Sequence, residues 1–212
     1  MEEQFWQLRW QQNNIAFHEA KPHPFLESHF GTIGVTSGDT ILVPLCGKSL
    51  DMDWLLAQGF HVIGIEFNQE AVEEVFERLA LAPEKSETQG LKRYHNGRLT
   101  LYVGDFFTLD KAMLGQIDGI FDRGAVVALP DEMRTRYAAH LASITDHAPQ
   151  LVIGYDYDQQ QTQGPPFSVP LSALQQLYSD IYSAVHLAAR PIEGPLAARC
   201  SGEEYAAALS PK

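Results

Sequence analysis

An α/β fold, with a mostly parallel sheet and helices on both faces, is predicted by two features of the sequence. Short apolar runs that resemble buried strands alternate with segments of helical periodicity along most of the chain. Residues 41–66 in particular combine a strand, a tight turn, a helix and a second strand in one short stretch. Parallel strands need crossover segments between them, and right-handed crossovers place the helices on both faces of the sheet.

This stretch carries the clearest pattern. Residues 41–43 are apolar and lead into a turn that contains Gly47, as expected for a buried parallel strand that stops at a glycine turn. Residues 49–58 have helical spacing of their apolar side chains, and a glycine follows them. Residues 62–65 form the next predicted strand, and Glu66 closes it.

The rest of the chain continues the alternation. We predict further strands at residues 99–103, 117–121, 151–155 and 184–188, and further helices at residues 69–81, 131–144 and 171–182. Residues 85–97 are polar and are expected to form a loop. Residues 2–12 are expected to form an amphipathic helix with its aromatic side chains on one side. This helix precedes the first strand by some thirty residues, so it can fold over the top of the sheet.

Composition favours a small-molecule substrate. The chain has 212 residues, a length typical of one domain with a full core. Its 27 acidic and 15 basic residues give a net charge of −12, and no run of Lys and Arg is present to neutralise a phosphate backbone. Binding of nucleic acid is therefore disfavoured. We expect a monomer.

The compartment predicted from the sequence is the cytoplasm. No segment reaches the roughly 18 to 20 apolar residues of a membrane span, and the acidic N-terminus has no signal-peptide core. We therefore expect no membrane association. The two cysteines, Cys46 and Cys200, are expected to be free thiols in a reducing compartment.

Glu66 and the turn before it predict an adenosine cofactor. Glu66 follows Gly47 by 19 residues, close to the spacing at which βαβ folds place a carboxylate against a ribose diol. The turn has a single glycine where a dinucleotide motif needs three, and Leu42 stands where a P-loop needs its first glycine. A crowded turn suits a cofactor with an adenosine and no phosphates. S-adenosylmethionine is the common one.

Six motifs then resemble one family. They are VPLCGKSLDM at 43–52, Trp6 and Trp10 with Phe17-His18, VIGIE at 62–66, GDFF at 104–107, DRGAVVALP at 122–130, and DYDQ followed by GPPFSVP at 156–170. In this order and spacing they resemble thiopurine S-methyltransferases, most closely the bacterial branch, over residues 3–170. Family members finish in an apolar and basic strand, whereas this chain ends RCSGEEYAAALSPK, so the resemblance does not extend to the final strand.

The resemblance implies a single class I, Rossmann-like, S-adenosylmethionine-dependent methyltransferase domain over residues 1–212. The implied sheet has seven strands, and residues 1–20 or so form a helical lid. The reaction would be methylation of the sulfur, or a related chalcogen, of small aromatic or heterocyclic thiols such as thiopurines, a detoxification activity. Two alternative functions are also compatible with the sequence. One is a non-catalytic S-adenosylmethionine-binding protein, and the other is a dinucleotide-dependent oxidoreductase.

The candidate site residues lie mainly just beyond predicted strand ends, where ligands bind in open α/β sheets. The resemblance implies that the cofactor is bound by Trp10, Leu45, Glu66, Asp105, Phe106 and Arg123. It implies that the substrate is bound by Trp6, Phe17, His18, Asp156, Pro166 and Phe167. Arg123 is the candidate catalytic residue. A guanidinium stays protonated in proteins, so it cannot act as a base, but it can hold an anionic acceptor or favour its thiolate form.

Each candidate also has a structural interpretation. Arg123 can form a salt bridge with the adjacent Asp122, and Cys46 at a buried strand end is expected to be a packed thiol rather than a nucleophile. The aromatic residues before position 20 can be the apolar face of a packed helix, and His18 a buried, hydrogen-bonded side chain. Asp156 and Asp158 can serve loop hydrogen bonding. Two carboxylates without a third oxygen ligand predict no metal site.

Overall fold

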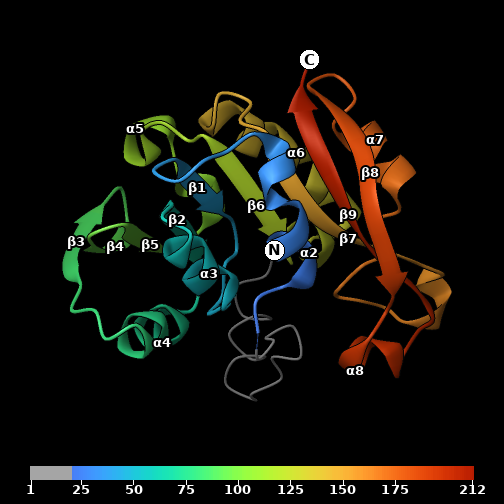
Figure 1. Ribbon diagram of the computed structural model, residues 1–212, viewed down its shortest axis with the longest axis horizontal. Coiled ribbons are helices and arrows are strands. Elements are labelled where there is room, and N and C mark those ends of the chain that lie inside the picture. Colours follow the sequence, from blue (N-terminus) through green and yellow to red (C-terminus); the bar gives the residue numbers. More distant parts are fainter. Residues whose placement is uncertain (1–20) are drawn as a thin grey trace.

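The computed structural model describes residues 21–212, and one sheet runs through them (Figure 1). Its strands are β1 (Thr40–Val43), β2 (His61–Glu66), β3 (Glu84–Thr88), β4 (Leu91–Asn96), β5 (Leu99–Val103), β6 (Gly119–Arg123), β7 (Gln150–Tyr157), β8 (Tyr182–Pro191) and β9 (Gly202–Pro211). Their order is β3-β4-β5-β2-β1-β6-β7-β9-β8. The five central strands, from β5 to β7, are parallel, and the pairings outside them are antiparallel.

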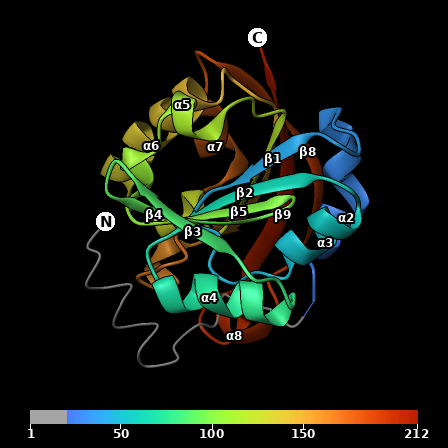
Figure 2. The same ribbon diagram turned by 90° about the vertical axis from the view of Figure 1, so that its left-hand side faces the viewer.

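Helices cover both faces of the sheet, as predicted (Figure 2). One face carries α2 (Pro24–His29), η1 (Phe30–Ile33), α3 (Asp51–Ala57) and α4 (Gln69–Arg78). The other carries η2 (Phe106–Thr108), α5 (Lys111–Leu114), η3 (Val126–Ala128), α6 (Asp131–Ile144) and α7 (Leu171–Leu177). The short α8 (Gly194–Ala197) lies at one end of the sheet, at the lower right in Figure 1, and Ser201 after it donates its N–H to Gln161 of η4 (Gln159–Gln161).

Two apolar cores result from the alternation of side chains along the central strands. In β1, Ile41 and Val43 face the core under α2 to α4, while Leu42 faces the core under α6 and α7. All three side chains are buried. Burial on both faces explains why the central strands are apolar runs without a polar alternation.

The sheet has nine strands within the described residues, so the prediction of seven was wrong in number although the fold class is confirmed. The difference is the segment 85–97, which was expected to be a loop. It forms most of the hairpin of β3 and β4, which adds two antiparallel strands beyond β5. Gln89 and Gly90 make its two-residue turn with φ of 49° and 81°, the signature of a type I′ turn. The hairpin escaped detection because it is mostly polar and its two buried side chains, Leu91 and Tyr94, belong to different cores, so no apolar alternation marks either strand.

The C-terminal segment forms β9, a ten-residue strand between β7 and β8. Its residues 205–209 are all buried, including three consecutive alanines, because helices and loops cover both faces at this position. The predicted helix at 171–182 ends earlier, at Leu177, and Tyr182 already belongs to β8. The predicted helix at 131–144 has the same bounds as α6. The predicted helix at 2–12 lies outside the described residues.

Within residues 21–212, no helix has the length and apolar character needed to cross a membrane.

Candidate active site

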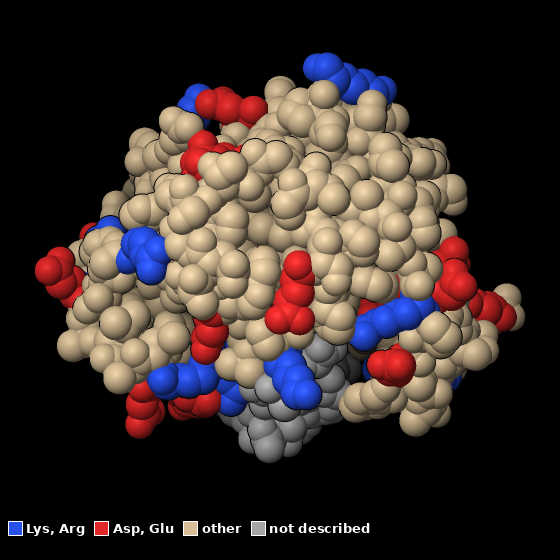
Figure 3. Space-filling view, viewed as in Figure 1, with Lys and Arg blue, Asp and Glu red and all other residues tan. Residues whose placement is uncertain are grey.

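The carboxyl ends of β1, β2 and β6 meet at one edge of the sheet, and a cavity of about 660 Å³ opens there. Its lining joins this edge to the segment before α2 and to α8. Figure 3 shows acidic and basic side chains interspersed around this lower edge. The charged residues that line the cavity are Lys21, Glu27, Lys48, Glu66, Arg123, Arg190, Glu193, Arg199 and Glu204. The lining of the cavity therefore carries charges of both signs.

Glu66 stands at the end of β2 and is held by the turn after β1. Its Oε2 accepts the backbone N–H of Gly47 at 3.0 Å, and its Oε1 accepts that of Asn68 at 3.0 Å. The side chain is 8% exposed. A carboxylate has about four acceptor positions, so Glu66 can also accept bonds from a pair of ligand hydroxyls. This arrangement fits a ribose diol.

Two residues of the turn after β1 have backbone φ angles in the left-handed region. Leu45 has φ of 47° and Gly47 has φ of 52°, which directs the backbone toward Glu66. A non-glycine residue in this region costs about 1 to 3 kcal/mol, and such strain concentrates at binding sites. Leu45 and Phe67 line the large cavity and also a smaller one, so the two cavities are adjacent.

The smaller cavity has a volume of about 80 Å³ and is lined by three of the four residues of the GDFF motif, Asp105, Phe106 and Phe107. Its walls are Leu45, Phe67, Asp105, Phe106, Phe107, Leu129, Met133, Arg136 and Tyr137. Asp105 is exposed and uses one oxygen to accept the Phe107 N–H, whereas Phe106 is buried. Flat apolar walls beside an exposed carboxylate suit a planar heterocycle with an amino group.

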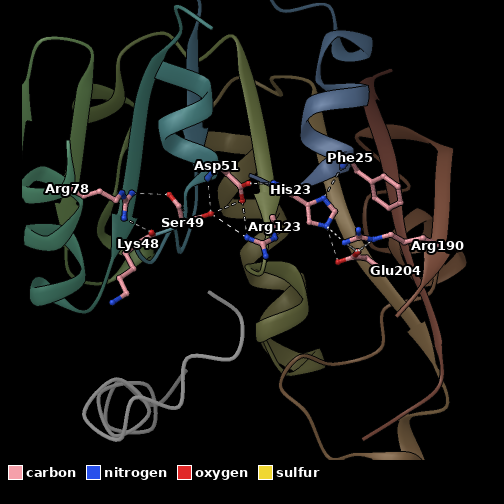
Figure 4. Close-up of polar contacts among 9 residues, drawn as sticks. All are labelled: His23, Phe25, Lys48, Ser49, Asp51, Arg78, Arg123, Arg190 and Glu204. Carbon is pink, nitrogen blue, oxygen red and sulfur yellow. Dashed lines mark hydrogen bonds and ion pairs between the residues drawn. The ribbon is translucent and has the colours of Figure 1, made fainter. Parts of the chain in front are cut away.

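Arg123 lines the large cavity, but its acidic partner is not the one that the sequence suggested. Its Nη1 lies 3.0 Å from Oδ2 of Asp51, on α3, and donates to Ser49 at 3.4 Å (Figure 4). A salt bridge to Asp122 was the structural alternative, and it does not form. Adjacent residues of a strand point to opposite faces, so Arg123 faces α3 while Asp122 faces α6.

Asp122 organises the turn that follows β6. It accepts the N–H groups of Ala125 and Val126 at 3.2 and 3.1 Å, and the hydroxyl of Tyr137 at 2.7 Å. Burial raises its pKa from 3.8 to about 6, against the opposing effect of these hydrogen bonds. The turn it holds includes Gly124, which lines the cavity beside Arg123.

Part of the cavity wall comes from the C-terminal part of the chain, which sequence reasoning did not assign to the site. Arg190 on β8 donates to Glu204 on β9 at 2.6 Å, and His23 Nε2 lies 3.1 Å from the same carboxylate (Figure 4). Burial raises the pKa of Glu204, but His23 and Arg190 outweigh it and bring the value to about 2. The sequence pattern did not indicate these residues, because the pairs Arg190–Glu204 and His23–Glu204 join positions that are not neighbours in the sequence.

The structure brings together only some of the predicted substrate residues. Pro166 lines the large cavity. The ring of Phe167 packs against Gly164 and under Arg134, and it is not among the residues that line the cavity. Asp156 is exposed at the end of β7, pairs in register with Glu203 and also lies outside the lining. Trp6, Trp10, Phe17 and His18 lie outside the described residues.

The cysteines and Asp158 have structural roles. Cys46 is buried, and burial, with the nearby charge of Glu66, raises its pKa well above the usual range. It is therefore a packed thiol, as expected. Cys200 is also buried and free. Asp158 caps η4 through the N–H of Gln160.

Comparison with known proteins supplies the context for this geometry. The chain matches the family described as Thiopurine S-methyltransferase (TPMT) over residues 1–199. The thiopurine S-methyltransferase of Xanthobacter autotrophicus is 43% identical over 206 residues, which cover 97% of each chain. That of Acinetobacter baylyi is 45% identical over 186 residues, which cover 86% of each chain.

Solved structures are similar in fold. A Burkholderia thailandensis 1,6-didemethyltoxoflavin-N1-methyltransferase, solved with 1,6-didemethyltoxoflavin and S-adenosylhomocysteine bound, superposes with a TM-score of 0.66. The two chains are 14% identical, and the match covers 98% of this chain and 87% of that one. At this identity the similarity concerns the fold alone.

Proposed function

Because the chain belongs to the thiopurine S-methyltransferase family, we propose that it methylates the sulfur of small aromatic or heterocyclic thiols, thiopurines among them, in the cavity beside Arg123. The chain is an S-adenosylmethionine-dependent methyltransferase, and S-adenosylmethionine is its cofactor. The observation that carries the proposal is one cavity whose lining joins a buried carboxylate at the end of β2, Glu66, to a cation at the end of β6, Arg123.

The residues present fit this cofactor. Glu66 would hold the ribose hydroxyls, and Leu45, Asp105 and Phe106 would enclose the adenine in the smaller cavity. The methionine part would extend toward Arg123, and we assign Trp10 to that region from the family resemblance. When bound, the cofactor supplies an electrophilic methyl group on a sulfonium.

The chain's own contribution to the reaction is positioning and electrostatics. Arg123 would stabilise the anionic acceptor, so the acceptor's proton goes to solvent before transfer and no protein base is required. The lining residues Val127, Ala128 and Pro166 would exclude water from one side of the acceptor. Phe167 would act by fixing the loop that carries Pro166, and Asp156 has no support from its position.

We further propose that residues 1–212 form one domain and that residues 1–20 act as a lid bearing Trp6, Phe17 and His18 toward the acceptor. Lys21 and Pro22, which follow this segment directly, line the large cavity. Hydrogen exchange of residues 2–17 should slow when S-adenosylhomocysteine binds. Equal exchange with and without the ligand would contradict the lid.

A methyl-transfer assay tests the substrate proposal. Purified protein with S-adenosylmethionine is offered thiopurines, thiophenols and selenium oxyanions, and methylated products are identified by mass spectrometry. Arg123→Lys keeps the charge but loses the planar fork, so we expect its activity on thiopurines to fall, and that of Arg123→Ala to fall further. Full activity in both variants, or no transfer to any thiol by the natural chain, would overturn the proposal.

A further inference from the structure

Asp51 is a buried carboxylate in the middle of the site's polar network. It is the first residue of α3 and is 1% exposed. Its Oδ2 accepts the Ser49 hydroxyl at 2.7 Å and lies 3.0 Å from Arg123 Nη1, while its Oδ1 accepts the backbone N–H of His23 at 2.7 Å (Figure 4). One carboxylate therefore connects β6, the turn before α3 and the segment before α2.

We propose that Asp51 is a positioning residue for the methyl transfer: it fixes the Arg123 guanidinium in the orientation that faces the acceptor. This inference rests on the proposed function, because it presupposes that Arg123 contacts the acceptor.

The geometry favours positioning over simple packing. A guanidinium has five N–H donors in a rigid fork, and Asp51 and Ser49 both engage the same nitrogen, Nη1. Anchoring one corner of a rigid plane sets the direction of the other donors. The Arg123 side chain is 11% exposed and lines the cavity, so its orientation is presented to whatever occupies the cavity.

The anchor is itself held rigidly. The Ser49 hydroxyl and the His23 N–H keep both oxygens of Asp51 in place, and the His23 ring packs between the N-terminus of α2 and Glu204. Nδ1 of His23 accepts the Phe25 N–H at 3.2 Å, which leaves Nε2 to donate to Glu204. The segment before α2 is thus tied to the same carboxylate that contacts Arg123.

The test compares Asp51→Asn and Asp51→Glu with the natural chain. We expect Asp51→Asn to lower kcat about ten- to a hundredfold, the range that a misplaced group costs, with a smaller change in S-adenosylhomocysteine affinity by calorimetry. The kcat-versus-pH profile of a thiophenol should also shift to higher pH, because it reports the thiol of the bound acceptor and a displaced cation stabilises its thiolate less. Asp51→Glu keeps the charge and should recover part of kcat and the natural profile.

Asp118→Asn is the matched control. Asp118 also accepts a backbone N–H, that of Thr40 at 2.8 Å, and it joins β1 to the start of β6, but at the opposite edge of the sheet. We expect this variant to lower the melting temperature and leave the pH profile in place. Thermal melts show whether each variant is folded under assay conditions.

A double variant distinguishes a failure of the proposed role of Asp51 from a failure of the proposed function. In an Arg123→Ala background, Asp51→Asn should cause no further loss of kcat, because its effect passes through Arg123. If Arg123 variants lose activity but Asp51→Asn keeps the natural kcat and profile, the inference on Asp51 is overturned while the proposed function stands. Additive losses in the double variant would also overturn it. Full activity in the Arg123 variants would overturn both.

Discussion

Glu66 has a structural role in addition to the ribose-binding role that we propose for it. Two backbone N–H groups, those of Gly47 and Asn68, fix its carboxylate at the end of β2. Both donors lie in loops, so the carboxylate also ties the turn after β1 to the start of α4. A residue of this kind is preorganised for a ligand, since its orientation is set before the ligand arrives.

We predict that Glu66→Ala weakens S-adenosylhomocysteine binding roughly ten- to a hundredfold, because loss of a charged hydrogen bond costs about 1.5 to 3 kcal/mol. Isothermal calorimetry measures the dissociation constant. Glu77→Ala, which changes an exposed carboxylate on α4, is the control and should bind normally. An unchanged dissociation constant in Glu66→Ala would remove the ribose assignment.

Asp122 is expected to oppose folding at neutral pH through its burial. Its folded pKa of about 6 exceeds the ordinary value of 3.8, so the folded protein binds the proton more tightly than the unfolded chain. The resulting stability is fully present below about pH 4 and is lost as the pH rises through about 6, by up to about 3 kcal/mol.

Asp122→Asn should remove this pH dependence while keeping an oxygen for the N–H groups of Ala125 and Val126. We predict that its free energy of unfolding near neutral pH equals or exceeds that of the natural chain. Urea denaturation at about pH 5 and about pH 7.5 measures the slope. A variant less stable than the natural chain at the higher pH would mean that the charge contributes more through its hydrogen bonds than it costs through burial.

At the scale of elements, the β3–β4 hairpin depends on two residues with positive φ. Gln89 occupies a position where type I′ turns favour Asn, and Gly90 has φ of 81°. We predict that Gln89→Asn raises the free energy of unfolding by roughly 0.5 to 1 kcal/mol. Gly90→Ala should lower it by about 1 to 2 kcal/mol, although no atom lies within 4 Å of the added methyl group, because only the backbone conformation opposes it. Opposite signs in chemical denaturation support the turn, and equal effects would contradict it.

The junction of α2, β8 and β9 is held by charge. Glu204 is 4% exposed, and its folded pKa of about 2 lies below the ordinary 4.5 because His23 and Arg190 outweigh the effect of burial. Its contribution to stability is present above about pH 4.5 and is lost as the pH falls through about 2, by about 3 kcal/mol in full.

Glu204→Gln should therefore be less stable than the natural chain at neutral pH and should lose part of the acid-induced destabilisation. Chemical denaturation near pH 7 and near pH 3 measures both effects. Glu203→Gln is the control, because its exposed side chain lies next to Glu204 on the opposite face of β9. If Glu204→Gln loses as much stability at low pH as the natural chain, other carboxylates cause the acid-induced destabilisation.

For the whole molecule, we predict a monomer. The sheet ends in two edge strands: the short polar strand β3, and β8, a ten-residue strand whose pairing with β9 shifts register between His186 and Ala188. Such an irregularity disfavours pairing with a second sheet, and a net charge of −12 adds repulsion between copies. Light scattering after size exclusion should give a mass near 23.6 kDa. A stable mass of twice this value would contradict the prediction.

Local and short-range information in the sequence was sufficient for the central part of the fold and for the proposal of Glu66 as a cofactor-binding residue. The strand–turn–helix–strand unit around Glu66 depends on apolar periodicity, a glycine turn and a fixed spacing, and all three are visible within 26 residues. The family resemblance added the methyl-transfer chemistry and the hypothesis that Arg123 lies at the reaction site. The polar hairpin at 84–96 was missed, although its two glycine turns were a usable signal.

Only the tertiary structure determined which charged residues form pairs. Arg123 pairs with Asp51, 72 residues away, rather than with its neighbour Asp122, because alternate residues of β6 face opposite layers of the molecule. Arg190 and Glu204 became part of the cavity wall because β9 inserts between β7 and β8. Hydrophobic periodicity reports which face of an element is buried, but not which element covers it. Contacts between distant charged residues are therefore determined by strand order, which periodicity does not encode.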